Sequence, residues 1–148
     1  MPREVNRQPI LRHPRRVIRY ELRPTLVNVP TLANPSGAQR FPCVEALLGT
    51  RTSVHDTVVS VIDQNGDELN FMVSCQVNQD QRLSVNRSLR SICEVEWCGS
   101  VLVMKIGRRS AFVNMTTSDK DLANVAIVRF IEETNGPVGL EYVDFLEL

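Results

Sequence analysis

The fold is decided by residues 54–77, which read VHDTVVSVIDQNGDELNFMVSCQV. Two apolar runs flank the pair Asn65-Gly66, a dipeptide typical of the tight turn that closes a β-hairpin. In the second run every other side chain is apolar, as expected for a strand with one buried face. The residues on that face are Leu69, Phe71, Val73, Cys75 and Val77. The stretch therefore predicts a half-buried pair of antiparallel strands.

A short helix and a second hairpin are predicted next along the chain. Residues 83–93 carry apolar side chains at helical spacing behind Ser84, which we expect to be the N-cap. Residues 94–115 then predict a hairpin that turns at residues 107–109. Its first strand contains four consecutive apolar residues, 101–104, which indicates a central position in the sheet.

The strongest helix signal begins after this hairpin. Ser118 and Asp121 have the spacing of a capping box, with Asp in place of the usual Glu or Gln. A wide apolar face follows and ends before Asn135-Gly136-Pro137, so the helix should pack on the sheet. Residues 138–148 are apolar and acidic, and fit either a last edge strand or a short helix. The apolar face consists of Leu122, Ala123, Ala126, Ile127, Phe130 and Ile131.

The N-terminal residues have a different composition. Six of the eight prolines fall within the first 35 residues, which excludes a continuous helix there. We expect an extended Pro/Arg-rich arm over residues 1–40, in which residues 15–23 permit one short edge strand. Residues 42–49, opened by proline and closed by glycine, predict one or two helical turns.

The fold class that follows is α+β. The order β-β-α-β-β-α predicts an antiparallel sheet of two hairpins with helices on one face. A chain of 148 residues with 43% hydrophobic and 23% charged residues suits one globular domain. We assign residues 41–148 to this domain, with an acidic C-terminal tail, and residues 1–40 to the basic arm.

The formal net charge of zero hides a strong asymmetry. Residues 1–23 contain seven arginines and two glutamates, a net charge of +5. Residues 130–148 contain five acidic and no basic residues, a net charge of −5. Opposite charges at the two ends favour a protein contact, either within one molecule or between two. The same arginines also suit phosphates, since the guanidinium binds them in a bidentate manner.

Residues with catalytic or metal-binding potential do not form a convincing site in the sequence. His55 is followed by Asp56, but neighbouring residues in a strand point to opposite faces, so Asp56 is poorly placed to orient the imidazole. Cys93 and Cys98 lack a second close pair of zinc ligands. Residues 63–68 have glycine at the wrong place for a calcium loop and fit a turn. We therefore expect no cofactor, and a hydrolase or transferase built on His55 has the least support.

The N-terminus has charges and prolines where a signal peptide needs an apolar run, and no stretch is long enough to span a bilayer. We therefore expect an intracellular protein, cytoplasmic or nuclear, with no membrane contact. In such a compartment cysteines are reduced. We expect no disulfide framework and mostly buried thiols at Cys43, Cys75, Cys93 and Cys98.

The functional prediction rests on the basic arm. We expect a non-enzymatic protein-interaction or assembly module that binds a protein partner, or self-associates, through residues 1–40. The alternative is a nucleic-acid-associated protein that binds phosphates without sequence preference, since the arm has a single aromatic residue and no recognition motif. For both, the predicted contact residues are Arg12, Arg15, Arg16, Arg19, Arg23 and Tyr20.

A pattern in residues 85–130 resembles small proteins of mushroom-forming (basidiomycete) fungi. It comprises Trp97-Cys98-Gly99, the apolar strand 101–105 that ends in lysine, and the polar helix start at 113–119 with Leu122. The resemblance supports the expected fold and implies no activity, cofactor or binding residue. The basic arm lies outside the pattern.

Overall fold

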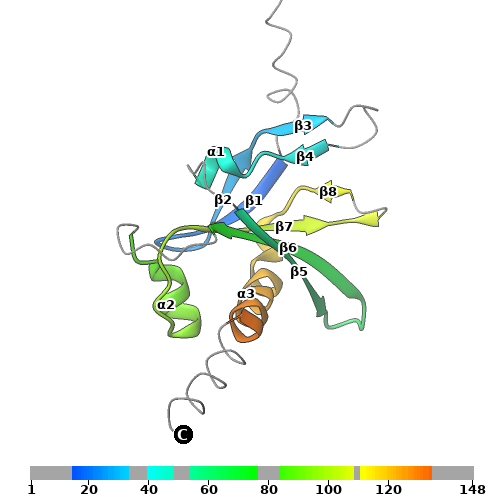
Figure 1. Cartoon of the computed structure of the whole chain (residues 1–148). Helices are drawn as coiled ribbons and strands as arrows, with labels where there is room; N and C mark the ends of the chain where they lie inside the picture. Colours follow the sequence, from blue (N-terminus) through cyan, green and yellow to red (C-terminus); the bar gives the residue numbers. More distant parts are fainter. Residues whose placement is uncertain (1–14, 34–39, 49–53, 77–83, 109–110, 135–148) are drawn as a thin grey trace, which may run out of the picture.

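The computed structural model describes residues 15–33, 40–48, 54–76, 84–108 and 111–134. The chain is α+β, with a six-stranded sheet and helices packed against it (Figure 1). The main sheet has the order β2-β1-β7-β6-β5, with β8 paired to β7, and every pairing is antiparallel. Its strands are β1 (Arg15–Tyr20), β2 (Thr25–Val29), β5 (Val54–Ile62), β6 (Glu68–Gln76), β7 (Val101–Ile106) and β8 (Phe112–Val113).

The hairpin expected at residues 54–77 is confirmed as β5 and β6, while Val77 lies outside the described residues. Its register runs from Val54 opposite Gln76 to Ile62 opposite Glu68. The carboxylate of Asp63 accepts hydrogen bonds from the backbone N–H groups of Asn65 at 2.8 Å and Asp67 at 2.9 Å, which fixes the turn. Gly66 has φ +85°, a conformation that favours glycine.

The second hairpin is confirmed, but its first strand begins at Val101 and not at residue 94. Strand β7 pairs with β8 through Lys105 opposite Val113, and it lies between β6 on one side and β1 and β8 on the other. Residues 101–104 are buried, as expected for a central strand covered on both faces.

The N-terminal residues differ from the expectation. The sequence assigned residues 1–40 to an extended arm in which residues 15–23 permit one edge strand, whereas β1 lies between β2 and β7 and is paired along both sides. Val17 packs into the core on one face of the sheet, while Ile18 packs on the other. Strand β1 therefore lacks the alternation of buried apolar and exposed polar residues that marks a half-buried strand. Pro24 and Pro30 lie just outside β2, so these prolines delimit a strand and do not exclude one.

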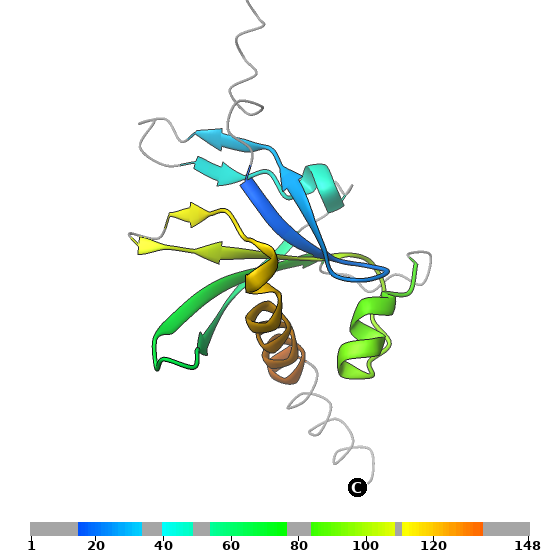
Figure 2. The ribbon, with the colours of Figure 1, turned by 180° about the vertical axis from the view of Figure 1, so that it is seen from behind.

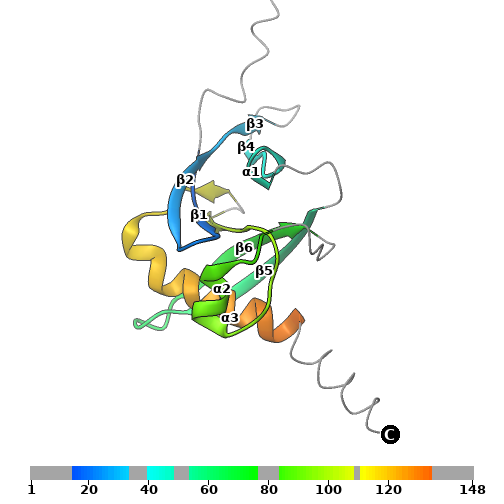
Figure 3. The same ribbon diagram turned by 90° about the vertical axis from the view of Figure 1, so that its left-hand side faces the viewer.

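Other elements of the chain pack against both faces of the sheet. Helices α2 (Arg87–Cys93) and α3 (Lys120–Thr134) lie on one face, as expected (Figures 1 and 3). The opposite face carries the short helix α1 (Glu45–Leu48) and the separate hairpin of β3 (Thr31–Ala33) and β4 (Arg40–Pro42), which Figure 2 shows from behind. The expectation of helices on one face thus holds for α2 and α3 but not for α1. Predicted elements in residues 138–148 lie outside the described residues.

The helix starts are displaced from the predicted positions. Asn86, not Ser84, caps α2: its side-chain oxygen accepts the backbone N–H of Leu89 at 3.0 Å. Before α3, a single 3-10 turn, η3 (Thr117–Asp119), is held by the Asp119 carboxylate, which accepts the backbone N–H of Thr116 at 2.8 Å. The capping pair is therefore Thr116 and Asp119, two residues before Ser118 and Asp121. The apolar face of α3 is confirmed, with Ala123, Ala126, Ile127, Phe130 and Ile131 buried.

A buried polar residue joins three segments. The side-chain amide of Asn86 donates to the main-chain oxygens of Tyr20 and Gly99, both at 2.8 Å, and its own N–H donates to the oxygen of Trp97 at 2.7 Å. Beside it, the N–H of Ser88 donates to the oxygen of Glu21 at 2.9 Å. Because buried polar groups are costly unless paired, this arrangement fixes the end of β1 against the start of α2.

Candidate interaction surface

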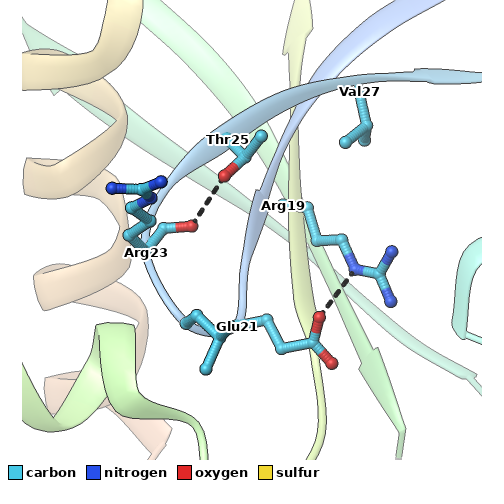
Figure 4. Close-up of a pocket in the computed structure, with 6 residues that line it drawn as sticks. Arg19, Glu21, Arg23, Thr25 and Val27 are labelled. Atoms are coloured by element: carbon cyan, nitrogen blue, oxygen red, sulfur yellow. Dashed lines mark hydrogen bonds and ion pairs between the residues drawn. The ribbon is translucent and has the colours of Figure 1, made fainter.

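The end of the β1–β2 hairpin contains a hollow of about 210 Å³ (Figure 4). Figure 4 shows Arg19 with Glu21 on one side of it and Arg23 on the other. Hydrogen bonds from the Asn86 side chain to the Tyr20 oxygen and from the Ser88 N–H to the Glu21 oxygen hold the turn that joins β1 to β2. These bonds define its position relative to α2. We call this surface the hairpin end; its residues are Arg19, Glu21, Leu22, Arg23, Thr25 and Val27.

Arg19 is held by its backbone and by one side-chain atom. It lies opposite Thr25 of β2 and Leu102 of β7 in the sheet register. Its Nε is 3.5 Å from the Glu21 carboxylate and 3.4 Å from the Ser100 hydroxyl oxygen. Among the described residues, neither Nη atom has a hydrogen-bond partner. The outer edge of the guanidinium is therefore available to a carboxylate or phosphate.

Arg23 and Leu22 form the tip of the hairpin. Arg23 is exposed, and within the described part of the chain only its backbone oxygen is engaged, accepting the Thr25 hydroxyl at 3.0 Å. Leu22 is 69% exposed, a large value for leucine. The hairpin end thus combines two guanidinium groups with an exposed leucine and the side chain of Val27. Such a surface can bind an acidic side chain that is followed or preceded by an apolar one.

The arginines that were predicted to contact a partner do not form one common surface. Arg12 lies outside the described residues. Arg15 and Arg19 share the face of β1 that carries Val17, whereas Arg16 is on the other face, because successive strand residues alternate. The Nε of Arg15 donates to the main-chain oxygen of Phe112 at 3.1 Å, a bond that ties β1 to β8. Of the described arginines, Arg19 and Arg23 line the hollow.

Tyr20 is placed in the core, which differs from the prediction that it contacts a partner. It has no exposed surface, and its hydroxyl donates to the side-chain oxygen of Asn124 on α3 at 2.7 Å. Burial, together with the nearby Cys93, raises the pKa of the phenol well above its usual value. A side chain in this position links β1 to α3 and cannot stack on a base.

The residues around His55 do not form a catalytic group. Asp56 accepts the hydroxyl of Ser74 on one face of the hairpin, and His55 Nε2 lies 2.9 Å from the Thr57 hydroxyl on the other. Cys75 is opposite His55 in the register, but burial and the charge of Asp56 raise the pKa of its thiol to about 11. The thiol is therefore protonated at neutral pH, and this geometry gives no support to nucleophilic catalysis.

Cysteine burial is less complete than expected. Cys75 is buried, whereas Cys43, Cys93 and Cys98 are half-buried, and none of these four described residues forms a disulfide. Within the described segments, no group of three or more His, Cys, Asp or Glu side chains lies close enough to hold a metal ion. No helix in the same segments has the length and apolar character needed to cross a membrane.

Sequence reasoning found the two arginines of the hairpin end but missed its other members. The missed residues lie in or beside the turn between β1 and β2; they are Glu21, Leu22, Thr25 and Val27. The only signal of this turn in the sequence is Pro24, because proline is common in turns. Recognition of β1 and β2 as a hairpin would have brought these residues together. Comparisons with family models, with curated proteins and with solved structures found no match to this chain.

Proposed function

We propose that this protein is a non-enzymatic interaction module that binds an acidic segment of a protein at the hairpin end. The observation that carries the proposal is the hollow of about 210 Å³ between Arg19 and Arg23 beside the exposed Leu22. The carboxylate of Glu21 offsets part of the positive charge of Arg19 and Arg23. One segment that carries a carboxylate is therefore enough to neutralise the charge that remains at the hairpin end. Arg is favoured at such contacts because its planar group binds a carboxylate in a bidentate manner.

One acidic segment with suitable chemistry belongs to the chain itself. Residues 130–148 contain five acidic residues, no basic residue, and several apolar side chains between the acidic ones. This composition complements the arginines and the apolar atoms of Leu22 and Val27. The partner is therefore either this segment, in the same or another copy, or a segment of another protein with the same alternation of acidic and apolar residues.

The nucleic-acid alternative has less support. Backbone-tracking proteins place basic side chains along a groove and stack bases on exposed aromatic rings. Arg15 and Arg16 lie on opposite faces of β1, and Tyr20 is buried. Binding of phosphates at Arg19 and Arg23 alone would be weak and would largely disappear at moderate salt.

The experiment uses a labelled peptide with the sequence of residues 135–148. The receptor is the full chain carrying E141Q, D144N and E147Q, so that its own acidic residues do not compete. We expect the affinity to fall about tenfold when R19Q and R23A are added, because each partly exposed ion pair contributes roughly 0.2–1 kcal/mol. Raising the salt concentration should weaken binding as well.

Two controls make the experiment specific. R87A removes an exposed arginine of α2 outside the hollow and should leave the affinity unchanged. A peptide in which Glu141, Asp144 and Glu147 are neutralised should bind at least about tenfold more weakly to the intact hairpin end. Equal binding of the acidic and neutral peptides, or equal losses with R87A and R23A, would overturn the proposal.

A further inference from the structure

We infer that β5 is a second interaction surface, which pairs in antiparallel fashion with β5 of a second copy of this chain. Strand β5 is the terminal strand of the main sheet and is nine residues long. In the described residues its only strand partner is β6. A long terminal strand presents unpaired N–H and C=O groups that can bind another strand.

The direction of these backbone groups follows from the hairpin turn. The N–H of Asp63 donates to the oxygen of Asp67 at 2.9 Å, so this pair is hydrogen-bonded. Hydrogen-bonded pairs alternate along an antiparallel ladder, and Val61 and Val59 therefore direct their backbone groups to β6. The even-numbered residues of β5 direct their backbone N–H and C=O groups away from the sheet.

An observation on α3 agrees with this assignment. The Nη1 of Arg129 donates to the main-chain oxygen of Ser60 at 2.8 Å. The side chain of Arg129 can reach the Ser60 oxygen from the neighbouring helix because this oxygen points outward from the edge of the sheet. Charged side chains at an edge strand are a common means of limiting strand pairing. Arg129 therefore competes with a second strand for the Ser60 oxygen.

The length and the side chains of β5 together favour a register centred on Val58, the middle residue of the strand, because this register pairs all nine residues. When the two-fold axis passes through Val58, this residue lies opposite Val58 of the second copy, and Asp56 lies opposite Ser60. Val54 then lies opposite Ile62. Val58 and Ile62 are 52% and 55% exposed in the single chain, and this pairing covers both. A register centred on Asp56 would instead place two carboxylates opposite each other, which is destabilising.

The charge pattern thus argues for a second copy as the occupant. The outward pairs are valine with valine, valine with isoleucine, and aspartate with serine, without a like-charge pair. The pairing uses the same outward N–H and C=O groups on both strands, so it closes with two-fold symmetry and leaves a continuous sheet across the two copies. Helix α3 of each copy lies on the same face of that sheet.

Sedimentation over a wide concentration range tests the inference with the full chain. The wild type should show a reversible monomer–dimer equilibrium. V58K should be monomeric at every concentration, because two lysines would face each other at the axis. R129Q should lower the dimer dissociation constant by about three- to tenfold, since two exposed charge-assisted contacts are released per dimer. V125K, an equally large change at an exposed position of α3, should leave the equilibrium unchanged.

Hydrogen exchange distinguishes this dimer from association elsewhere. The amides of Val58 and Ser60 should exchange rapidly at low concentration and slowly at high concentration, whereas those of Thr57 and Val59 should be protected at both. R23A should not alter the dimer, so failure of the hairpin-end proposal and failure of this one are separable. A monomeric wild type at all concentrations, equal effects of V58K and V125K, or a weaker dimer with R129Q would overturn the inference.

Discussion

The side-chain Nδ2 of Asn86 donates a hydrogen bond to the main-chain oxygen of Tyr20 at 2.8 Å, and thereby joins the start of α2 to the end of β1. The same residue caps α2 and holds the backbone of Gly99. The Tyr20 oxygen immediately precedes the turn that carries Glu21, Leu22 and Arg23. Asn86 therefore helps to fix the position of the hairpin end, together with the N–H of Ser88.

Replacement of Asn86 by aspartate should destabilise the fold strongly. Asp has nearly the same shape but lacks the two N–H donors, so the oxygens of Tyr20 and Gly99 lose their partner beside a buried charge. We expect the free energy of unfolding to fall by about 2–4 kcal/mol, measured by urea denaturation. N28D, at an exposed position of β2, is the matched control and should change stability little. A loss for N86D no larger than that for N28D would contradict this role.

The buried phenol of Tyr20 predicts a loss of stability at alkaline pH. Its folded pKa is raised by burial and by Cys93, whereas an unfolded tyrosine ionises at about 10. The stabilising contribution is complete below about pH 10 and decreases as the pH rises further, because only the unfolded chain releases the proton. Y20F should therefore show a shallower decline of unfolding free energy between about pH 10 and 12. Identical slopes for the wild type and Y20F would refute this prediction.

Asp119 predicts the opposite dependence at acidic pH. Burial acts to raise its pKa, but the hydrogen bond from the Thr116 N–H and the contact with Lys105 outweigh it, and the net pKa is lowered. Its contribution to stability is present above the unfolded pKa of about 3.9 and is lost as the pH falls through the folded value. D119N should be less stable than the wild type at neutral pH, and this difference should narrow toward about pH 2.

The control for Asp119 is D121N, which changes an exposed aspartate two residues away at the first turn of α3. It should show a much smaller difference at neutral pH, because Lys105 Nζ is bonded to Asp119 at 3.0 Å. If D119N and D121N follow the same pH profile, the contact with Lys105 contributes nothing specific.

Cys75 should be the thiol that reacts most slowly in the native protein. It is buried, and burial with the nearby Asp56 raises its pKa to about 11, so little thiolate is present at pH 8. Titration with a thiol reagent should give one phase whose rate follows unfolding, and C75A should remove that phase alone. Rapid reaction of Cys75 without denaturant would show that this part of β6 opens readily.

The sequence was sufficient for the elements whose signals are local. Asn65-Gly66 with a period of two predicted β5 and β6, and the apolar face at residues 122–131 predicted α3. Strand β1 was expected only as a possible edge strand, and its central place in the sheet was missed, because it is covered on both faces and arginines interrupt its apolar residues. The helix caps were displaced by two residues, since Ser, Thr, Asn and Asp candidates follow one another and tertiary contacts select among them.

The candidate site was less predictable than the fold. Charge alone identified Arg19 and Arg23, but the sequence treated five arginines as one extended surface. The pairing of β1 with β7 fixes this strand in the sheet, so that Arg15 and Arg19 lie on one face and Arg16 on the other. The Nε of Arg15 also donates to the main-chain oxygen of Phe112. These are contacts between residues more than 80 positions apart, which no local pattern contains.

Binding of an acidic segment at the hairpin end is tested most directly by an NMR titration of the labelled full chain carrying E141Q, D144N and E147Q. The unlabelled peptide of residues 135–148 is added, and backbone amide shifts are followed. We expect saturable shifts concentrated at residues 19–27 and their loss in the variant that also carries R23A. Shifts confined to β5, or no shifts at low salt, would contradict it.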